Sequence, residues 1–178
     1  MELYKDTLNR VTDWLKFAEA KNALLAAASG ASTWAAVRIL GSDSVCGWSK
    51  IYFYVLLACV ASSLALSLAS LLPITKYLPL LIGRRPEKHE NHIYFGHLAH
   101  YRTSTLIEAI DACHPESAEL SDTLKRCFAE QIIINSRIAV AKYRVFNIAL
   151  IIMLSGIITP VLAILLIFII QWKGRIDG

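Results

Sequence analysis

Residues 145–170 read VFNIALIIMLSGIITPVLAILLIFII and contain no charged side chain. A bilayer core of about 30 Å needs a helix of about 20 apolar residues. This run of 26 residues has a helical length of about 39 Å, so we expect the helix to tilt and to kink at Pro160. The run predicts a membrane-spanning helix, with Trp172 and Lys173 just beyond its end.

The segment before this run predicts a helix that continues into the membrane. Pro115, with Glu116 and Glu119 close behind it, suits the start of a helix. No Pro or Gly occurs from Glu116 to Ser155. Apolar residues then recur every four positions, at Leu120, Leu124, Phe128 and Ile132. One uninterrupted helix is therefore expected from this polar segment into the last span.

The region upstream of that helix is more broken. Prolines and glycine mark a linker at Pro73, Pro79, Gly83 and Pro86. A short helix is expected from Thr105 to about Cys113, because Thr105 and Glu108 have the spacing of a capping box. No stretch has a convincing strand pattern; the best extended candidate, His92–Leu98, is interrupted by Gly96.

Two further runs are long enough to cross a bilayer. Ile51–Leu72 is uncharged, whereas Asn22–Leu40 is diluted by Arg38 and several small polar residues. Before Asn22 the chain alternates charges with apolar residues at helical spacing, namely Leu3, Tyr4, Leu8, Val11, Trp14, Leu15, Phe17 and Ala18. No helix breaker precedes Gly30, which predicts one long helix that begins in water and enters the membrane.

Small residues recur every four positions in two of these spans. They are Ala61, Ala65 and Ala69 in one span, and Ala23, Ala27, Ala31 and Ala35 in the other. Faces of this kind allow close helix approach in membranes. The faces can pack within one protomer or between protomers. Three transmembrane helices are too few to line a pore, so we expect a homo-oligomer.

Composition supports a membrane protein with a modest water-facing part. Hydrophobic residues make up 56% of the 178 residues and charged residues 18%, against about 45–50% and 25% in soluble domains. The net charge of +4 is too small to argue for nucleic acid. The four cysteines and the histidines at 89, 92, 97 and 100 complete no known metal pattern. No catalytic motif is present, so we expect no enzyme, metal or cofactor.

The basic residues set the expected orientation. Lys16 and Lys21 precede the first span, Arg84 and Arg85 follow the second, and Lys142 and Arg144 precede the third. The positive-inside rule then places the N-terminus and residues 73–144 in the cytoplasm. Lys142 and Arg144 are also interpreted as anchors that reach the lipid headgroups.

These observations predict an all-α membrane protein with three transmembrane helices. Residues 1–72 hold the N-terminal amphipathic helix with the first two spans. Residues 73–144 form a cytoplasmic helical sensing region with a short helical insert. Residues 145–178 hold the third span and a short tail. The first and third membrane helices both extend into the cytoplasm.

Three elements resemble the Pycsar transmembrane effector family. WLKFAEAK at Trp14–Lys21 is similar to its opening, HIYFGHLA at His92–Ala99 to its central element, and EQIIINSRIAVAKYR at Glu130–Arg144 to the helix before its last span. The elements follow the family's order and cover most of the chain. Glu19 stands where the family usually shows Asp.

The resemblance implies a bacterial antiphage effector in the inner membrane. A nucleotide cyclase encoded nearby would supply a cyclic pyrimidine mononucleotide, cUMP or cCMP. The effector would bind this nucleotide, act on membrane lipid to impair the inner membrane, and so stop the growth of the cell. Two alternatives stay open: a membrane scaffold or accessory subunit that binds a protein through its cytoplasmic helices, and, less favoured, a membrane enzyme.

For such a ligand the sequence offers candidate side chains of three kinds. A flat base needs an apolar slot, its edge needs amides or hydroxyls, and its phosphate needs a cation. The candidates are Trp14, Tyr94 and Phe95 for the slot, Gln131, Asn135 and Ser136 for the edge, and Lys21, His97 and Arg137 for the phosphate.

Overall fold

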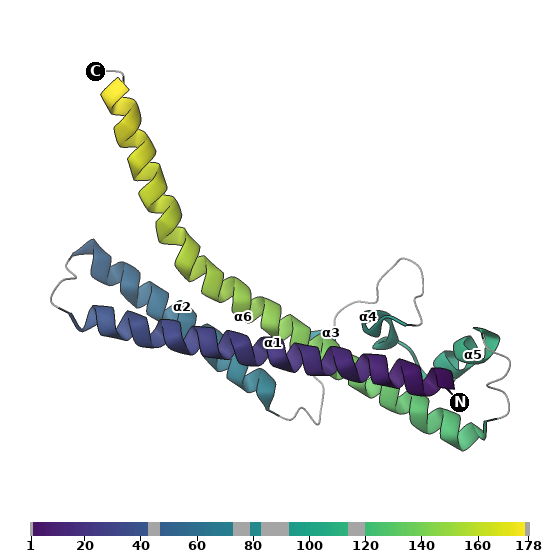
Figure 1. The fold of residues 1–178 in the computed structure, drawn as a ribbon. Helices are drawn as coiled ribbons and strands as arrows, with labels where there is room; N and C mark the ends of the chain where they lie inside the picture. Colours follow the sequence, from purple (N-terminus) through teal and green to yellow (C-terminus); the bar gives the residue numbers. More distant parts are fainter. Residues whose placement is uncertain (1, 43–46, 73–78, 83–92, 114–119, 177–178) are drawn as a thin grey trace. The chain divides into compact units, whose positions relative to one another are not determined.

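A computed structural model describes residues 2–42, 47–72, 79–82, 93–113 and 120–176 (Figure 1). Within these ranges the regular structure is entirely helical. The helices are α1 (Glu2–Leu40), α2 (Trp48–Leu71), α3 (Pro79–Ile82), α4 (Phe95–Leu98), α5 (Thr103–Cys113) and α6 (Asp122–Ile176). The all-α prediction is confirmed.

Three helices are long and apolar enough to cross a membrane. They are the helices that span Glu2–Leu40, Ser49–Leu71 and Asp122–Thr159. Both long helices predicted from the absence of breakers are continuous, since α1 has 39 residues and α6 has 55. The helix of α6 also continues through Pro160. Tilt and kink of this span stay predictions.

The chain divides into two compact units, each built from separate segments. The first, here the head unit, comprises Met1–Asn22 and Ser70–Val145; the second, here the membrane unit, comprises Ala23–Ala69 and Phe146–Gly178. Both α1 and α6 therefore contribute residues to each unit. The predicted division into residues 1–72, 73–144 and 145–178 describes which side of the membrane each part occupies. It stays a prediction.

The head unit is held by a core between α1, α4, α5 and α6. In Figure 1 the purple start of α1 lies along the green part of α6. In α1 the buried hydrophobic residues of this unit recur every seven positions, at Tyr4, Val11 and Ala18. In α6 buried residues recur at alternating intervals of four and three, at Lys125, Ala129, Ile132, Ser136 and Ala139. Leu98, Leu106 and Ile110 of the shorter helices complete the core. Parallel packing of these stripes positions the water-facing side chains described below.

One ion pair joins the end of α5 to the start of α6 at the edge of this core. Lys125 of α6 is 4% exposed and bonds through Nζ to Asp111 Oδ2 of α5 at 2.8 Å. Burial and the charge of Asp111 raise the pKa of the neighbouring Tyr4 to about 12. The start of α1 is thus packed against α5 and α6.

The start of α5 differs from the prediction by two residues. The helix begins at Thr103, and the hydroxyl of Thr105 accepts a hydrogen bond from the Arg102 N–H at 3.2 Å. Thr105 therefore lies inside the helix and bonds back to Arg102, the residue before it. The capping box predicts Thr105 as the N-cap residue, so this prediction is wrong. The expected start of α6 at Pro115 lies outside the described residues, and the described helix begins at Asp122.

The membrane unit packs through small and polar side chains. Ser29 of α1 bonds to Ser63 of α2 at 3.0 Å and lies 3.4 Å from the sulfur of Met153 in α6. At Gly156 of α6 an added Cβ would lie 2.8 Å from the Cβ of Cys59, so only glycine permits this approach. By contrast, most residues of the predicted small-residue faces are exposed, namely Ala23, Ala27, Ala31, Ala61, Ala65 and Ala69, and Ala35 is half-buried.

Candidate functional site

Four aromatic side chains from three helices meet in the head unit. The ring of Phe95 in α4 stacks on Tyr143 of α6 with a centroid distance of 5.3 Å and an interplanar angle of 26°. Trp14 of α1 lies 5.5 Å from Phe95 and 6.5 Å from Tyr143. Tyr94 lies 4.8 Å from Phe95. We call these four residues the aromatic cluster.

Two basic side chains border the aromatic cluster. Lys21 places its Nζ 5.7 Å from the centroid of the Tyr143 ring and 4.6 Å from that of Phe17, distances typical of cation–π contacts. The imidazole of His97 lies 5.6 Å from the ring of Tyr94. Of the predicted site residues, the structure thus brings together Trp14, Lys21, Tyr94, Phe95 and His97.

The aromatic cluster depends on the single turn of α4. The carbonyl of Tyr94 accepts hydrogen bonds from the N–H groups of His97 and Leu98, at 3.0 and 3.1 Å. The Tyr94 ring lies directly over Gly96, where an added Cβ would come within 2.4 Å of it. Glycine at this position therefore lets Tyr94 fold back beside Phe95.

Arg137 connects α6 to the end of α4. Its Nε donates a hydrogen bond to the carbonyl of Ala99 at 2.9 Å. This contact gives Arg137 a positioning role for the aromatic turn. Its predicted contact with a phosphate stays a prediction.

Of the three residues predicted to read the edge of a base, two contact each other on the helix surface and the third is buried. Gln131 Nε2 donates to Asn135 Oδ1 at 3.0 Å on an exposed part of α6. Ser136 is fully buried between the helices. The structure therefore does not bring Gln131 and Asn135 to the aromatic cluster by any contact within its described part, and their role stays a prediction.

A buried ion pair lies beside the cluster, between α1 and α6. Lys142 Nζ bonds to Glu19 Oε1 at 2.8 Å, and the lysine side chain is only 5% exposed. Asn22, also buried, donates to the carbonyl of Lys142 at 3.3 Å and to that of Ala18 at 2.9 Å. The interpretation of Lys142 as a headgroup anchor is wrong in this structure, because its ammonium is turned inward toward Glu19.

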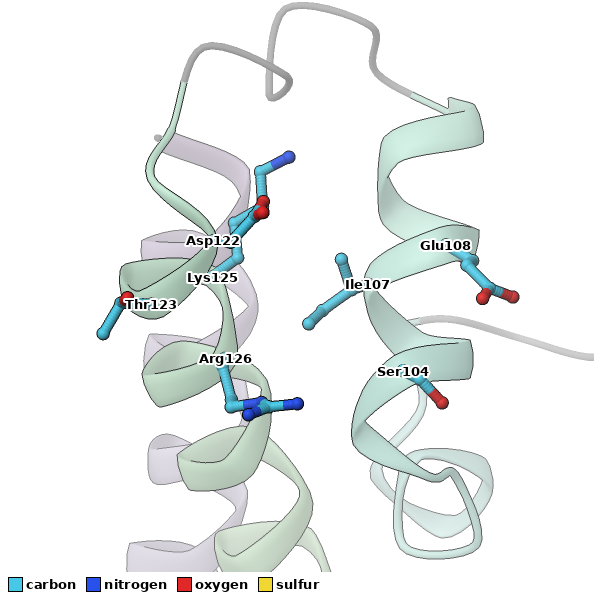
Figure 2. A pocket seen from close by; sticks show the side chains of 7 residues that line it. All are labelled: Ser104, Ile107, Glu108, Asp122, Thr123, Lys125 and Arg126. Atoms are coloured by element: carbon cyan, nitrogen blue, oxygen red, sulfur yellow. The ribbon is translucent and has the colours of Figure 1, made fainter.

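A second candidate is a groove of about 450 Å³ between α5 and the start of α6. Figure 2 shows Ile107 of α5 and Arg126 of α6 reaching toward one another across it. Glu108, Asp122 and Lys125 add charges of both signs to its lining, and Lys125 is already paired with Asp111. The lining described contains no aromatic ring, so this α5–α6 groove offers little to a flat base.

The aromatic cluster is closed in this structure. A flat ligand inserted between two rings would hold them about 7–8 Å apart, twice an ordinary carbon contact. The ring centroids of Phe95 and its neighbours are 5.3 and 5.5 Å apart. A base can therefore stack on the outer faces of Trp14 and Tyr94, which are 43% and 45% exposed, or must displace a ring.

Tyr143 is the residue of this cluster that sequence reasoning missed. Its neighbours Lys142 and Arg144 mark a span boundary, where an aromatic residue commonly faces lipid headgroups. Its stacking on Phe95, 48 positions away in the sequence, has no local signal. Burial, and then the neighbouring Tyr94, raise the pKa of Tyr143 above its ordinary value.

The fold and this cluster define a helical protein with three helices able to span a membrane and a cluster of aromatic rings in its head unit. The family model of the Pycsar effector protein domain matches residues 3–169. The chain therefore belongs to the Pycsar effectors, membrane proteins that act in antiphage defence through cyclic-nucleotide signalling. Searches of curated proteins and of solved structures found no match.

Proposed function

We propose that this protein binds a cyclic pyrimidine mononucleotide, cUMP or cCMP, at the aromatic cluster and then impairs the bacterial inner membrane. The observation that carries the proposal is the convergence of Trp14, Phe95 and Tyr143, from three helices, beside the ammonium of Lys21. A cyclic mononucleotide is a flat base joined to one negative phosphate, so it matches an aromatic surface beside a cation.

In this proposal the base displaces the half-exposed rings of Trp14 and Tyr94 and stacks against them. Lys21 meets the phosphate, and His97 lies near enough to Tyr94 to assist. Gln131, Asn135, Ser136 and Arg137 complete the proposed set of contact residues, with Arg137 also holding α4 through Ala99. The ligand comes from a nucleotide cyclase, and the response involves lipid and several copies of the chain.

The link to the membrane rests on connectivity. Both α1 and α6 carry residues of the aromatic cluster and also supply residues to the membrane unit. A ligand that reorders Trp14 and Tyr143 thus acts on two helices that enter the bilayer. The N-terminus and residues 73–144 are proposed to be cytoplasmic, where the cyclase product accumulates.

Calorimetry on the full chain in detergent tests the binding step. The parent protein should bind cUMP or cCMP more tightly than cAMP. Trp14→Ala should weaken binding about 5- to 100-fold, the range for one stacked base, and Lys21→Gln about tenfold or more. Trp34→Ala is the matched control, because Trp34 is exposed on α1 in the membrane unit.

Two outcomes of this titration contradict the proposal. A parent protein that binds neither nucleotide removes the ligand assignment. Binding that survives Trp14→Ala but is lost in Arg126→Ala moves the site to the α5–α6 groove. Release of a trapped dye from vesicles, measured with and without the nucleotide, tests membrane impairment separately.

A membrane scaffold is the second candidate function. The head unit exposes the apolar side chains of Ile93, Leu124 and Ile134 at 52%, 40% and 42%, which suits a protein partner as well as a solvated surface. A scaffold should bind a protein through these residues and show no heat with either nucleotide. The same calorimetry therefore separates the two candidates.

A further inference from the structure

The hydroxyl of Tyr143 is a polar atom that the packing of the aromatic cluster does not explain. It is buried and makes no hydrogen bond within the part of the chain that the structure describes. A buried polar group without a partner costs its desolvation energy, and native proteins retain few such groups. Phenylalanine would keep the stack on Phe95 without this cost, so the hydroxyl requires a reason beyond packing.

Two more buried polar atoms lack a partner among the described residues, one on the same helix as Tyr143 and one on a residue bonded to its neighbour Lys142. Ser136 is fully buried with its Oγ unpaired among the described residues, and its place seven residues before Tyr143 puts both on one face of α6. A helical tyrosine side chain leans toward the helix N-terminus, hence toward Ser136. Asn22, bonded to the carbonyl of Lys142, has an unpaired Oδ1 in the same described set.

We infer that the Tyr143 hydroxyl contacts the pyrimidine edge of the bound nucleotide, an assignment that rests on the function proposed above. A phenol both donates and accepts, so it can meet the carbonyl of uracil or the amino group of cytosine. Lys21 Nζ lies 5.7 Å from the centroid of the same ring. A phosphate at Lys21 therefore leaves the base within reach of Tyr143.

The nucleotide reaches this hydroxyl by parting the half-exposed rings of Trp14 and Tyr94. The closed spacing of the cluster requires such a movement, since rings 5.3–5.5 Å apart leave no room for a base. The hydroxyl is then unpaired only while the site is empty. The bound nucleotide then supplies a hydrogen-bond partner, which offsets the desolvation cost of the buried hydroxyl.

Replacing Tyr143 by Phe separates these effects, because it removes the hydroxyl and keeps the ring. Without ligand, Tyr143→Phe should unfold at the same temperature as the parent or a higher one. Its affinity for the nucleotide should fall about tenfold, or about 1.4 kcal/mol. Tyr101→Phe is the matched control, because Tyr101 is 5% exposed in the head unit and lies outside the cluster; it should leave affinity unchanged. Ser136→Ala serves as a second variant and should repeat the pattern of Tyr143→Phe.

Three other results would contradict either the Tyr143 contact or the proposed function. If the parent binds and Tyr143→Phe binds equally well, the contact is wrong while the proposed function stands. If Tyr143→Phe unfolds at a lower temperature without ligand, the hydroxyl already has a partner such as a bound water, and the inference fails. If the parent binds neither cUMP nor cCMP, the proposed function and this contact fail together.

Discussion

At the scale of single residues, the pair between Glu19 and Lys142 is unevenly exposed. The lysine side chain is 5% exposed and the glutamate side chain 48%. A buried ammonium left without its partner is strongly destabilising, whereas an exposed carboxylate is readily hydrated. The two residues therefore differ in what their loss costs.

This asymmetry predicts losses of stability of different size for two substitutions. Glu19→Gln should lower stability by about 1–2 kcal/mol, less than the roughly 3–5 kcal/mol of a fully buried pair because water screens Glu19. Lys142→Met should cost less, since an apolar chain of similar length replaces the buried charge. Thermal unfolding in detergent measures both.

The double variant provides the control for this pair. Glu19→Gln combined with Lys142→Met should be no less stable than Lys142→Met alone, because no charge is left buried. Equal losses in both single variants, adding fully in the double variant, would show that the two side chains do not interact.

At the scale of elements, α4 is a single turn whose shape depends on Gly96. The clash at 2.4 Å is with the far end of the Tyr94 ring, which can swing away at little cost. Gly96→Ala should therefore leave the unfolding temperature nearly unchanged while displacing Tyr94 from the aromatic cluster. Tyrosine fluorescence should change, and nucleotide affinity should fall several-fold; unchanged affinity would remove Tyr94 from the site.

The outward alanine face of α2 carries a separate expectation about assembly. Ala61, Ala65 and Ala69 are exposed within one chain, so they are available to pack against a second copy. Ala65→Leu should weaken the oligomer without unfolding the protomer, whereas Leu68→Ala on the same helix serves as a control. Light scattering in detergent reads out the mass. A parent that is monomeric with and without nucleotide contradicts the expectation.

Helix existence was predictable here, and helix environment was less so. The lengths of α1 and α6 follow from runs without Pro or Gly, a local property of the chain. The burial of Ser136 and the exposure of Gln131 depend on which face of α6 meets α1, which no local signal determines. Thr105 illustrates the same limit, because its hydroxyl can cap forward or bond backward to Arg102 with the same sequence.

At the scale of the whole molecule, three spans predict opposite sides for the two chain ends. Single cysteines at Ser42 and Trp172, in a variant without the four native cysteines, should react with an impermeant reagent from the periplasm. A cysteine at Glu2 should be protected until the membrane is opened. Protection of the Trp172 position together with Glu2 would contradict three spans.

The candidate site was predictable in kind and only partly in membership. Trp14, Tyr94 and Phe95 were predictable because a flat base needs an apolar slot and all three lie in the elements that resemble the family. Tyr143 did not, because a tyrosine beside Lys142 and Arg144 is equally typical of a membrane boundary. The pairing that distinguishes these cases, Phe95 on Tyr143, joins distant parts of the chain and depends on the packed fold.

Helix pitch turns residue number into an angle. In α1 the buried positions Tyr4, Val11, Ala18 and Leu25 repeat every seven residues. One residue inserted between Ala18 and Leu25 rotates everything beyond it by about 100°, whereas seven residues rotate it by only about 20°. We therefore expect evolution to retain insertions and deletions in this stretch in steps of seven, so that its gene tolerates changes of 21 bases where a single added codon is lost.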